Sequence, residues 1–298
     1  MSGVTTTGAT VIVGLDFAPP GILLWRAILQ WLGGIGIIVM AVAILPMLQI
    51  GGMQMFRVEA FDADKVLPRA AQIAGGIAIV YVFLTAVAVL VLWSLGMSGF
   101  DAVAHAMTSI ATGGFSTHDA SVGHFDNAAI DWAMSTIMIL GSVPFVLYLR
   151  VVRGDLKPVF ADTQVRWFLA IVVASVLLVA LWLYQGELMG PVDALRYRKP
   201  IPDSVATSVM SFFFLFATCF ALLAVGLGLT GLDFITAVSG AASAIANVGP
   251  GLGDIIGPAG TFATLPDSSK LLLSLGMLLG RLELFTVLIL LAPAFWRG

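Results

Sequence analysis

Two long apolar runs, residues 205–229 and 271–294, flank a glycine-rich stretch at residues 231–254. Each run is long enough to cross a bilayer, which takes about 20 apolar residues. The stretch between them is too polar and too rich in glycine to cross. Such an arrangement restricts the chain to membrane folds in which a short loop enters the protein between two spanning helices.

The loop itself has two parts. The first reads as a short helix with Asp233 as its N-cap, and the second is Asn247-Val248-Gly249-Pro250-Gly251, which cannot be helical. Irregular backbone at membrane depth is tolerated where it is buried in protein or lines a watery cavity. The pattern therefore predicts a pore loop, in which backbone carbonyls replace the water shell of a cation.

The composition indicates a polytopic α-helical membrane protein. Only 10% of the 298 residues are charged, against about 25% in an average soluble domain, and 59% are hydrophobic. The single cysteine, Cys219, permits no disulfide within the chain, and no Cys/His motif suggests a metal. Residues 249–254 lack the lysine of a phosphate loop. We therefore expect neither an enzyme, nor a cofactor, nor a nucleic-acid partner.

The loop pattern occurs twice. Further apolar runs lie at residues 21–47, 70–95, 128–149 and 167–184, and a short helix beginning at Gly99 and ending near Thr112 follows the second of them. Residues 70–150 and 205–294 therefore share one span–loop–span plan, which predicts a repeated architecture with the site where the repeats meet. Glycines 33, 34 and 36 lie within the first span, where close helix packing is expected.

Basic residues set the orientation and expose a conflict. The loops at residues 57–69 and 150–166 hold seven Lys and Arg, whereas residues 96–127 hold none, so the former are predicted to be cytoplasmic. If the run at 167–184 also crosses, the basic cluster at 196–199 is external and the last pore loop opens inward. Either a crossing segment is missing between Asp193 and Pro200, or the run at 167–184 lies along the interface.

Four stretches together resemble the TrkH/KtrB family of bacterial potassium transporter pore subunits, TrkH most closely. They are TTTGATVIVGLD at the start, WLGGIGIIVMAVAILPML in the first span, GGFSTHDAS after the second span and IANVGPGLG near the end. The resemblance implies an all-α polytopic membrane protein of the potassium-channel-like superfamily, built from four helix–pore-loop–helix repeats. It implies potassium conduction in the bacterial inner (plasma) membrane, a homodimer, a cytoplasmic nucleotide-binding regulatory subunit like TrkA, and classification as a symporter.

By this resemblance the chain is incomplete. Residues 1–64 correspond to the remainder of the first repeat, 65–160 to the second, 161–197 to the outer helix of the third and 198–298 to the fourth. The N-terminal segments of the family and the third pore loop are expected to be absent.

The resemblance also assigns candidate filter segments, each with glycine at its third place. Their carbonyls are expected to bind K⁺, because glycine readily adopts the backbone angles that such a filter needs. The segments are Thr6, Thr7 and Gly8; Thr112, Gly113 and Gly114; and Asn247, Val248 and Gly249.

Arg281 and Glu283 are charged residues in the last span, where charge is costly and functional roles are common. The resemblance gives Arg281 the role of a barrier below the filter; the alternative is that each residue pairs elsewhere for packing. His105, His118 and His124 are expected to be structural or solvated, although His118 and Asp119 lie where they can tune cation entry. Two other functions stay open: an ion-coupled secondary transporter, and a non-conducting truncated homologue.

Overall fold

The computed structural model describes residues 1–43, 66–152, 154, 162–184 and 203–282. Regular structure in these ranges is entirely helical, which confirms the predicted all-α class. The α-helices are α1 (Pro20–Ala43), α2 (Val66–Ser94), α3 (Gly99–Ile110), α4 (Ala128–Ser142), α5 (Phe145–Val152), α7 (Thr163–Tyr184), α8 (Asp203–Leu229), α9 (Phe234–Ala246), α10 (Gly253–Ile256) and α11 (Asp267–Arg281). Short 3₁₀ helices are η1 (Leu15–Phe17), η5 (Ser121–Phe125) and η6 (Phe262–Thr264).

In the first group of helices, α3 packs against α1, α2 and α4. Small residues on α3 allow this close packing, and Ala102 and Ala106 join a core that includes Tyr81 and Leu92 of α2. The helix begins with an N-cap: the amide of Asp101 donates to the Ser98 hydroxyl, which in turn donates to the Asp101 carboxylate. The cap is therefore Ser98, one residue before the predicted start at Gly99.

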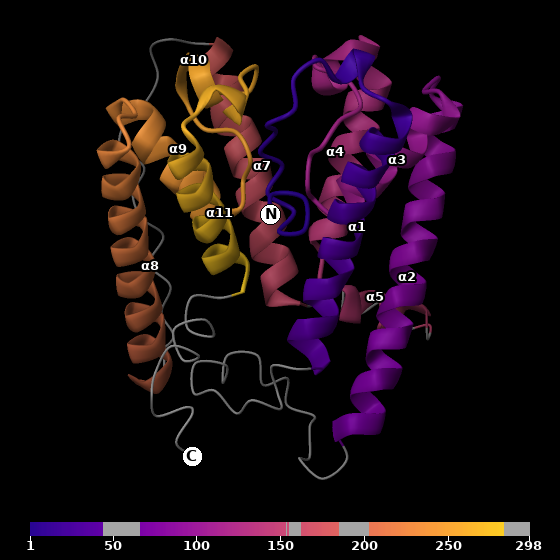
Figure 1. The fold of residues 1–298 in the computed structure, drawn as a ribbon. Helices are drawn as coiled ribbons and strands as arrows, with labels where there is room; N and C mark the ends of the chain where they lie inside the picture. Colours follow the sequence, from indigo (N-terminus) through magenta and orange to yellow (C-terminus); the bar gives the residue numbers. More distant parts are fainter. Residues whose placement is uncertain (44–65, 153, 155–161, 185–202, 283–298) are drawn as a thin grey trace.

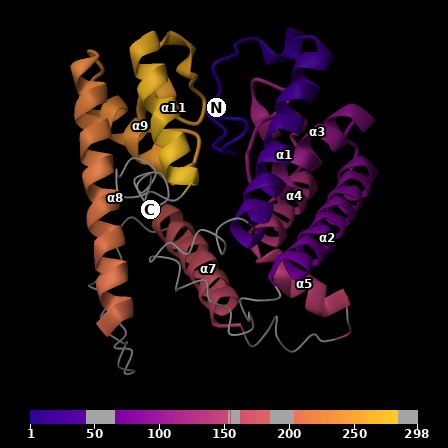
Figure 2. The ribbon, with the colours of Figure 1, turned by 60° about the horizontal axis from the view of Figure 1, so that its bottom comes forward.

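In the second group, α9 packs between α8 and α11 in the same way. Its N-cap is Asp233, whose carboxylate accepts from the amide of Thr236, as the sequence predicts. The N-terminal segment lies between the two groups in both views (Figures 1 and 2). The repeated helix–pore-loop–helix plan is therefore confirmed for these two parts of the chain.

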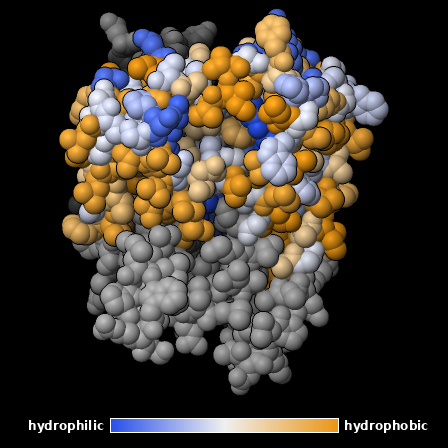
Figure 3. Space-filling view, viewed as in Figure 1, coloured by the Kyte–Doolittle hydropathy of each residue, from blue (hydrophilic) through white to orange (hydrophobic). Residues whose placement is uncertain are grey.

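Several spans agree with prediction. Within the described residues, Ile73–Ser94 and Phe212–Leu229 are long and apolar enough to cross a membrane. The expected kink near Pro144 is a sharp bend, since α4 and α5 meet at 91°. Taken together as one bent span, these two helices are also long and apolar enough to cross a membrane. Apolar side chains cover much of the face drawn in Figure 3, as expected for a surface in contact with lipid. Residues 44–47 of the first span and 283–294 of the last lie outside the described residues.

The helix directions bear on the orientation conflict. Figure 1 shows α7 and α8 both running from the bottom of the view to the top, although they are consecutive among the described helices. The short helices α3 and α9 both descend from the top. Both pore loops therefore open to the same end. Because α7 runs in the same direction as α8, the structure favours the missing crossing segment over a run at 167–184 that lies along the interface.

Candidate ion-binding site

The three candidate filter segments share one hydrogen-bonding pattern at their start. The amide of the first residue donates to the carbonyl three residues earlier, and the amide of the second donates to the carbonyl five residues earlier, at 2.8–3.3 Å. Two segments end α3 and α9, and the other ends a turn over residues 1–5. This pair of hydrogen bonds is the motif that ends a helix with a left-handed residue. The first residues are accordingly left-handed, with φ of 52° at Thr6, 53° at Thr112 and 52° at Asn247.

The third residue of each segment is also left-handed. These glycines have φ of 89° at Gly8, 78° at Gly114 and 114° at Gly249, whereas no residue at the second place has positive φ. In each segment, left-handed residues alternate with a residue that is not left-handed. This alternation keeps successive peptide planes in similar orientations, so their carbonyl oxygens can face one side of the segment. A β-branched threonine with positive φ is a backbone outlier, and such strain concentrates at functional sites.

The three segments meet backbone to backbone. A Cβ atom placed on Gly8 would overlap with the carbonyl oxygen of Gly113 and would lie 3.9 Å from the Cα of Gly249. A Cβ on Gly249 would lie 2.6 Å from the carbonyl oxygen of Thr7. The structure therefore brings together residues separated by more than 200 positions in the sequence, at one point between the two helix groups.

The side chains of Gln30 and Ser243 hold the second and the last filter segments in place by hydrogen bonds to their backbone. Gln30 of α1 is fully buried; its Nε2 donates to the Gly113 carbonyl at 2.7 Å and its Oε1 accepts from the Phe115 amide at 3.0 Å. The Ser243 hydroxyl of α9 donates to the Gly249 carbonyl at 2.7 Å and accepts from the amide of the same residue at 3.0 Å. The Gly113 and Gly249 carbonyls thus already accept one hydrogen bond each, and each retains a second lone pair.

Other polar contacts connect the segments to one another. Asn247 Nδ2 donates to the Thr7 hydroxyl at 2.8 Å and to the Met277 carbonyl of α11 at 3.0 Å. Arg26 Nη2 donates to the Thr10 hydroxyl at 3.1 Å, and its guanidinium lies 4.3 Å from the centre of the Phe115 ring. Sequence reasoning missed Gln30 and Ser243, because nothing in their local pattern separates them from ordinary helix residues. Arg26 does carry a signal, since it is a charged residue within a predicted span, and the structure shows it to be only 7% exposed.

The helix or turn that precedes each filter segment ends against a glycine of a later helix. A Cβ on any of these glycines would overlap with the carbonyl oxygen of the residue two positions before a filter segment. The pairs are Gly33 of α1 with Val4, Gly141 of α4 with Ile110, and Gly280 of α11 with Ile245. The predicted close packing is confirmed at Gly33 and at Gly34, where a Cβ would lie 2.7 Å from the Tyr81 hydroxyl oxygen, but not at Gly36, where a Cβ would have no atom within 4 Å.

Arg281 lies at the end of α11, next to Gly280 and therefore close to the inner end of α9. Its side chain is partly buried, and its Nε has no hydrogen-bond partner within the described residues. Glu283 lies outside the described residues. An arginine so placed adds positive charge near the start of the last filter segment, since the neighbouring Gly280 lies against Ile245 and Asn247.

The histidines divide into two kinds. His105 has a structural role, which is one of the two roles predicted for it. It is 1% exposed, and its ring nitrogens contact the Asp101 carbonyl at 2.8 Å and the Ser116 hydroxyl at 2.9 Å. His118 and His124 instead stack on one another beside Asp16. The sequence motifs gave no sign of this cluster, because Asp16 is about a hundred positions from either histidine.

Comparison with known proteins identifies the family. Residues 1–186 and 199–297 match the TrkH model, described as a cation transport protein. The whole chain is 39% identical to 76% of the Trk system potassium uptake protein TrkI from Halomonas elongata. The chain belongs to the TrkH family. It is also 32% identical to the TrkH potassium uptake protein of Escherichia coli, over 99% of this chain and 78% of that protein.

A solved structure of the family has the same fold. The potassium transporter TrkH from Vibrio parahaemolyticus superposes with a TM-score of 0.83 at 31% identity, over 99% of this chain and 77% of that one. The TrkH match is interrupted at residues 187–198, where the charge pattern predicts a missing crossing. The aligned stretch with the Halomonas relative is 376 residues long, so that protein has internal residues with no counterpart in these 298.

Proposed function

We propose that this chain is a pore subunit for potassium uptake, which binds dehydrated K⁺ through backbone carbonyls of the three filter segments. The observation that carries the proposal is the shared backbone of residues 6–8, 112–114 and 247–249 and their meeting at one point. A cation leaves water only where other oxygens replace its hydration shell, and rings of carbonyls serve this purpose in potassium-selective filters.

The bracing contacts fit this proposal. Hydrogen bonds from Gln30 and Ser243 fix the planes of two peptide groups and leave one lone pair on each carbonyl. The pore helices add the partial negative charge of their C-termini, since all three segments begin where a helix or helical turn ends. Arg281 then acts as an electrostatic barrier below the filter, opposing cation passage.

The wider setting is proposed from the family. The relatives named above are Trk system potassium uptake proteins. We therefore place the chain in the bacterial inner membrane as a homodimer with a TrkA-like nucleotide-binding regulatory subunit, within a potassium uptake system of the symporter class. A second candidate function is that of a non-conducting homologue. The interruption of the family match at residues 187–198 supports this alternative.

Ion-dependent stabilisation tests the binding site. Purified protein is heated in KCl, NaCl or choline chloride at equal ionic strength, and unfolding is followed by intrinsic fluorescence. We expect K⁺ to raise the melting temperature above its value in Na⁺, because a bound ligand stabilises only the folded state.

The matched variants are Gly249→Ser and Gly228→Ala. The first puts a side chain against the Thr7 carbonyl, whereas the second adds a methyl group to α8 where no atom lies within 4 Å. The K⁺ preference should disappear in Gly249→Ser and persist in Gly228→Ala. Equal melting temperatures of the unmodified chain in K⁺ and Na⁺ would contradict the proposal.

A further inference from the structure

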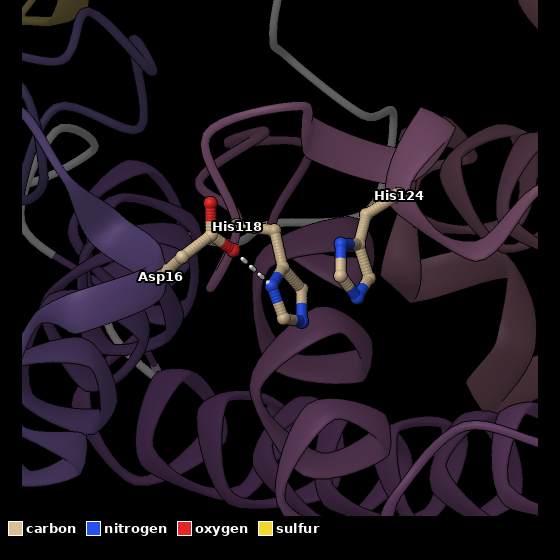
Figure 4. Close-up of side chains that lie close together, drawn as sticks. All are labelled: Asp16, His118 and His124. Carbon is tan, nitrogen blue, oxygen red and sulfur yellow. Dashed lines mark hydrogen bonds and ion pairs between the residues drawn. The ribbon is translucent and has the colours of Figure 1, made fainter.

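At the outer rim of the site, Asp16, His118 and His124 converge (Figure 4). One ligand atom from each lies within 4.8 Å of the others. His118 Nδ1 contacts Asp16 Oδ1 at 2.6 Å, and the two imidazole rings are parallel, with centres 3.5 Å apart and planes inclined by 4°. The three residues come from η1, from the loop after the second filter segment, and from η5.

We propose that these three residues bind a divalent transition-metal ion of the zinc class, which ties the first pore loop to the second. Two imidazole nitrogens and one carboxylate oxygen form a donor set that suits Zn²⁺, Co²⁺ or Ni²⁺. Mg²⁺ and Ca²⁺ prefer oxygen ligands throughout, so they fit this set poorly. The inference concerns the rim alone and does not depend on potassium binding at the filter.

The unsatisfied nitrogen of His118 supports the assignment. Its Nε2 is buried without a hydrogen-bond partner among the described residues, although Asp101 Oδ1 lies 3.5 Å away. If the metal takes Nδ1, the ring proton resides on Nε2 and points toward Asp101. A carboxylate that accepts the second N–H of a metal-bound histidine is a recurring feature of zinc sites. Asp101 is itself held in place by the hydroxyl groups of Ser98 and Thr117.

The stacked rings need a small adjustment. Ligand atoms on a tetrahedral zinc ion lie about 3.3 Å apart, since each is about 2.0–2.1 Å from the metal. His124 is exposed and lies in the short helix η5, so its ring is free to tilt out of the stack toward the other two ligands. Asp16 and His124 both face solvent, which leaves a fourth position for water.

The expected consequence is a stiffer junction between two repeats. Two weaker contacts already join the same loops: the Leu15 amide donates to Asp119 Oδ1 at 3.0 Å, and the Asp119 amide donates to Asp16 Oδ2 at 3.4 Å. The metal ion bonds Asp16 on the first loop and His118 and His124 on the second, in place of the hydrogen bond between Asp16 and His118. Because Asp16 follows the first filter segment and His118 follows the second, the ion constrains the outer ends of both.

Titration of the purified full chain with Zn²⁺ tests the proposal, after any affinity tag has been removed. We expect one zinc ion per chain by calorimetry, a higher melting temperature with Zn²⁺ but not with Mg²⁺, and tetrahedral absorption bands with Co²⁺. Asp16→Asn, His118→Gln and His124→Phe should each weaken zinc binding by more than about tenfold, since even second-shell changes cost that much.

His124→Phe is the decisive variant, because it keeps a flat ring over His118 and removes only the ligand. His124→Cys supplies another zinc ligand and should restore binding. Asp254→Asn, an exposed acidic position on α10, is the control and should bind zinc normally. Unchanged zinc affinity in His124→Phe, or no zinc binding by the unmodified chain at micromolar concentration, would overturn the proposal.

Discussion

Gln30 connects two points of the chain at the second filter segment, since its side-chain amide pairs with both the Gly113 carbonyl and the Phe115 amide. It fills the space that a side chain at position 113 would need, because a Cβ on Gly113 would lie 2.5 Å from Gln30 Oε1. The glycine and the glutamine therefore depend on one another: the first leaves room, and the second satisfies two buried backbone groups.

We predict that Gln30→Leu destabilises the protein by about 2–4 kcal/mol, because it leaves a buried donor and a buried acceptor without partners. Gln30→Glu should also be harmful, since a carboxylate accepts from the Phe115 amide but cannot donate to Gly113. Thermal unfolding in detergent measures both effects. Thr136→Val, which removes an exposed hydroxyl bonded within α4, is the control. A Gln30→Leu variant as stable as this control would show that water replaces the amide.

Arg281 carries a second prediction at this scale. In a background with all four filter segments, Arg281→Ala should raise cation flux, because a positive charge beside the ion path opposes cation entry. Flux per folded protein in liposomes is the measurement. If Arg281 instead serves packing, the same change lowers thermal stability and leaves flux per folded protein no higher; that result would remove its role as a barrier.

The glycine contacts between helices belong to the scale of the element. Gly33, Gly141 and Gly280 each bring a following helix against the end of a pore turn, at equivalent places in three repeats. Backbone contact of this kind requires glycine for its missing side chain and not for its φ, because all three lie within helices. The helix or turn before each filter segment is therefore packed against a later helix. Any residue larger than glycine at these three positions would prevent this close approach.

Gly141→Ala should destabilise the second repeat by about 1–3 kcal/mol, since the added methyl group overlaps with the Ile110 carbonyl and forces α4 away from α3. Alanine at Gly228 of α8, where the space is open, should be neutral or slightly stabilising, because alanine favours helix more than glycine does. Melting temperatures of the two variants provide the comparison. A Gly141→Ala protein that melts with the Gly228→Ala protein would show that α4 shifts at little cost.

At the scale of the whole molecule, the sequence predicts the spans, the repeats and the glycines of the filter segments. Hydrophobic length and the position of glycine are local properties, so they can be read from the chain. Left-handed threonine at positions 6 and 112 cannot be read in this way, because β-branched residues disfavour that conformation and only the packed structure imposes it. The cluster of Asp16, His118 and His124 is equally invisible, since it depends on the meeting of two repeats.

The last filter segment has an open side. Val248 is 63% exposed, whereas Thr7 at the same place in the first segment is 1% exposed. Within the described part of the chain, the first segment is thus enclosed by its neighbours and the last is not. A filter built from three such segments leaves one quadrant of the ion path without carbonyls, so a cation there keeps part of its water shell instead of exchanging it for protein oxygens.

We therefore predict that this chain does not conduct potassium by itself. Purified protein is reconstituted in potassium-loaded liposomes beside a complete family member, and K⁺ efflux is measured with equal amounts of inserted protein. The chain should show no selective K⁺ flux above that of empty liposomes, even where K⁺ raises its melting temperature. Selective flux near the rate of the complete protein would contradict the prediction. It would indicate that a neighbouring subunit supplies the fourth segment, and cross-linking through a cysteine introduced by Val248→Cys would then identify that neighbour.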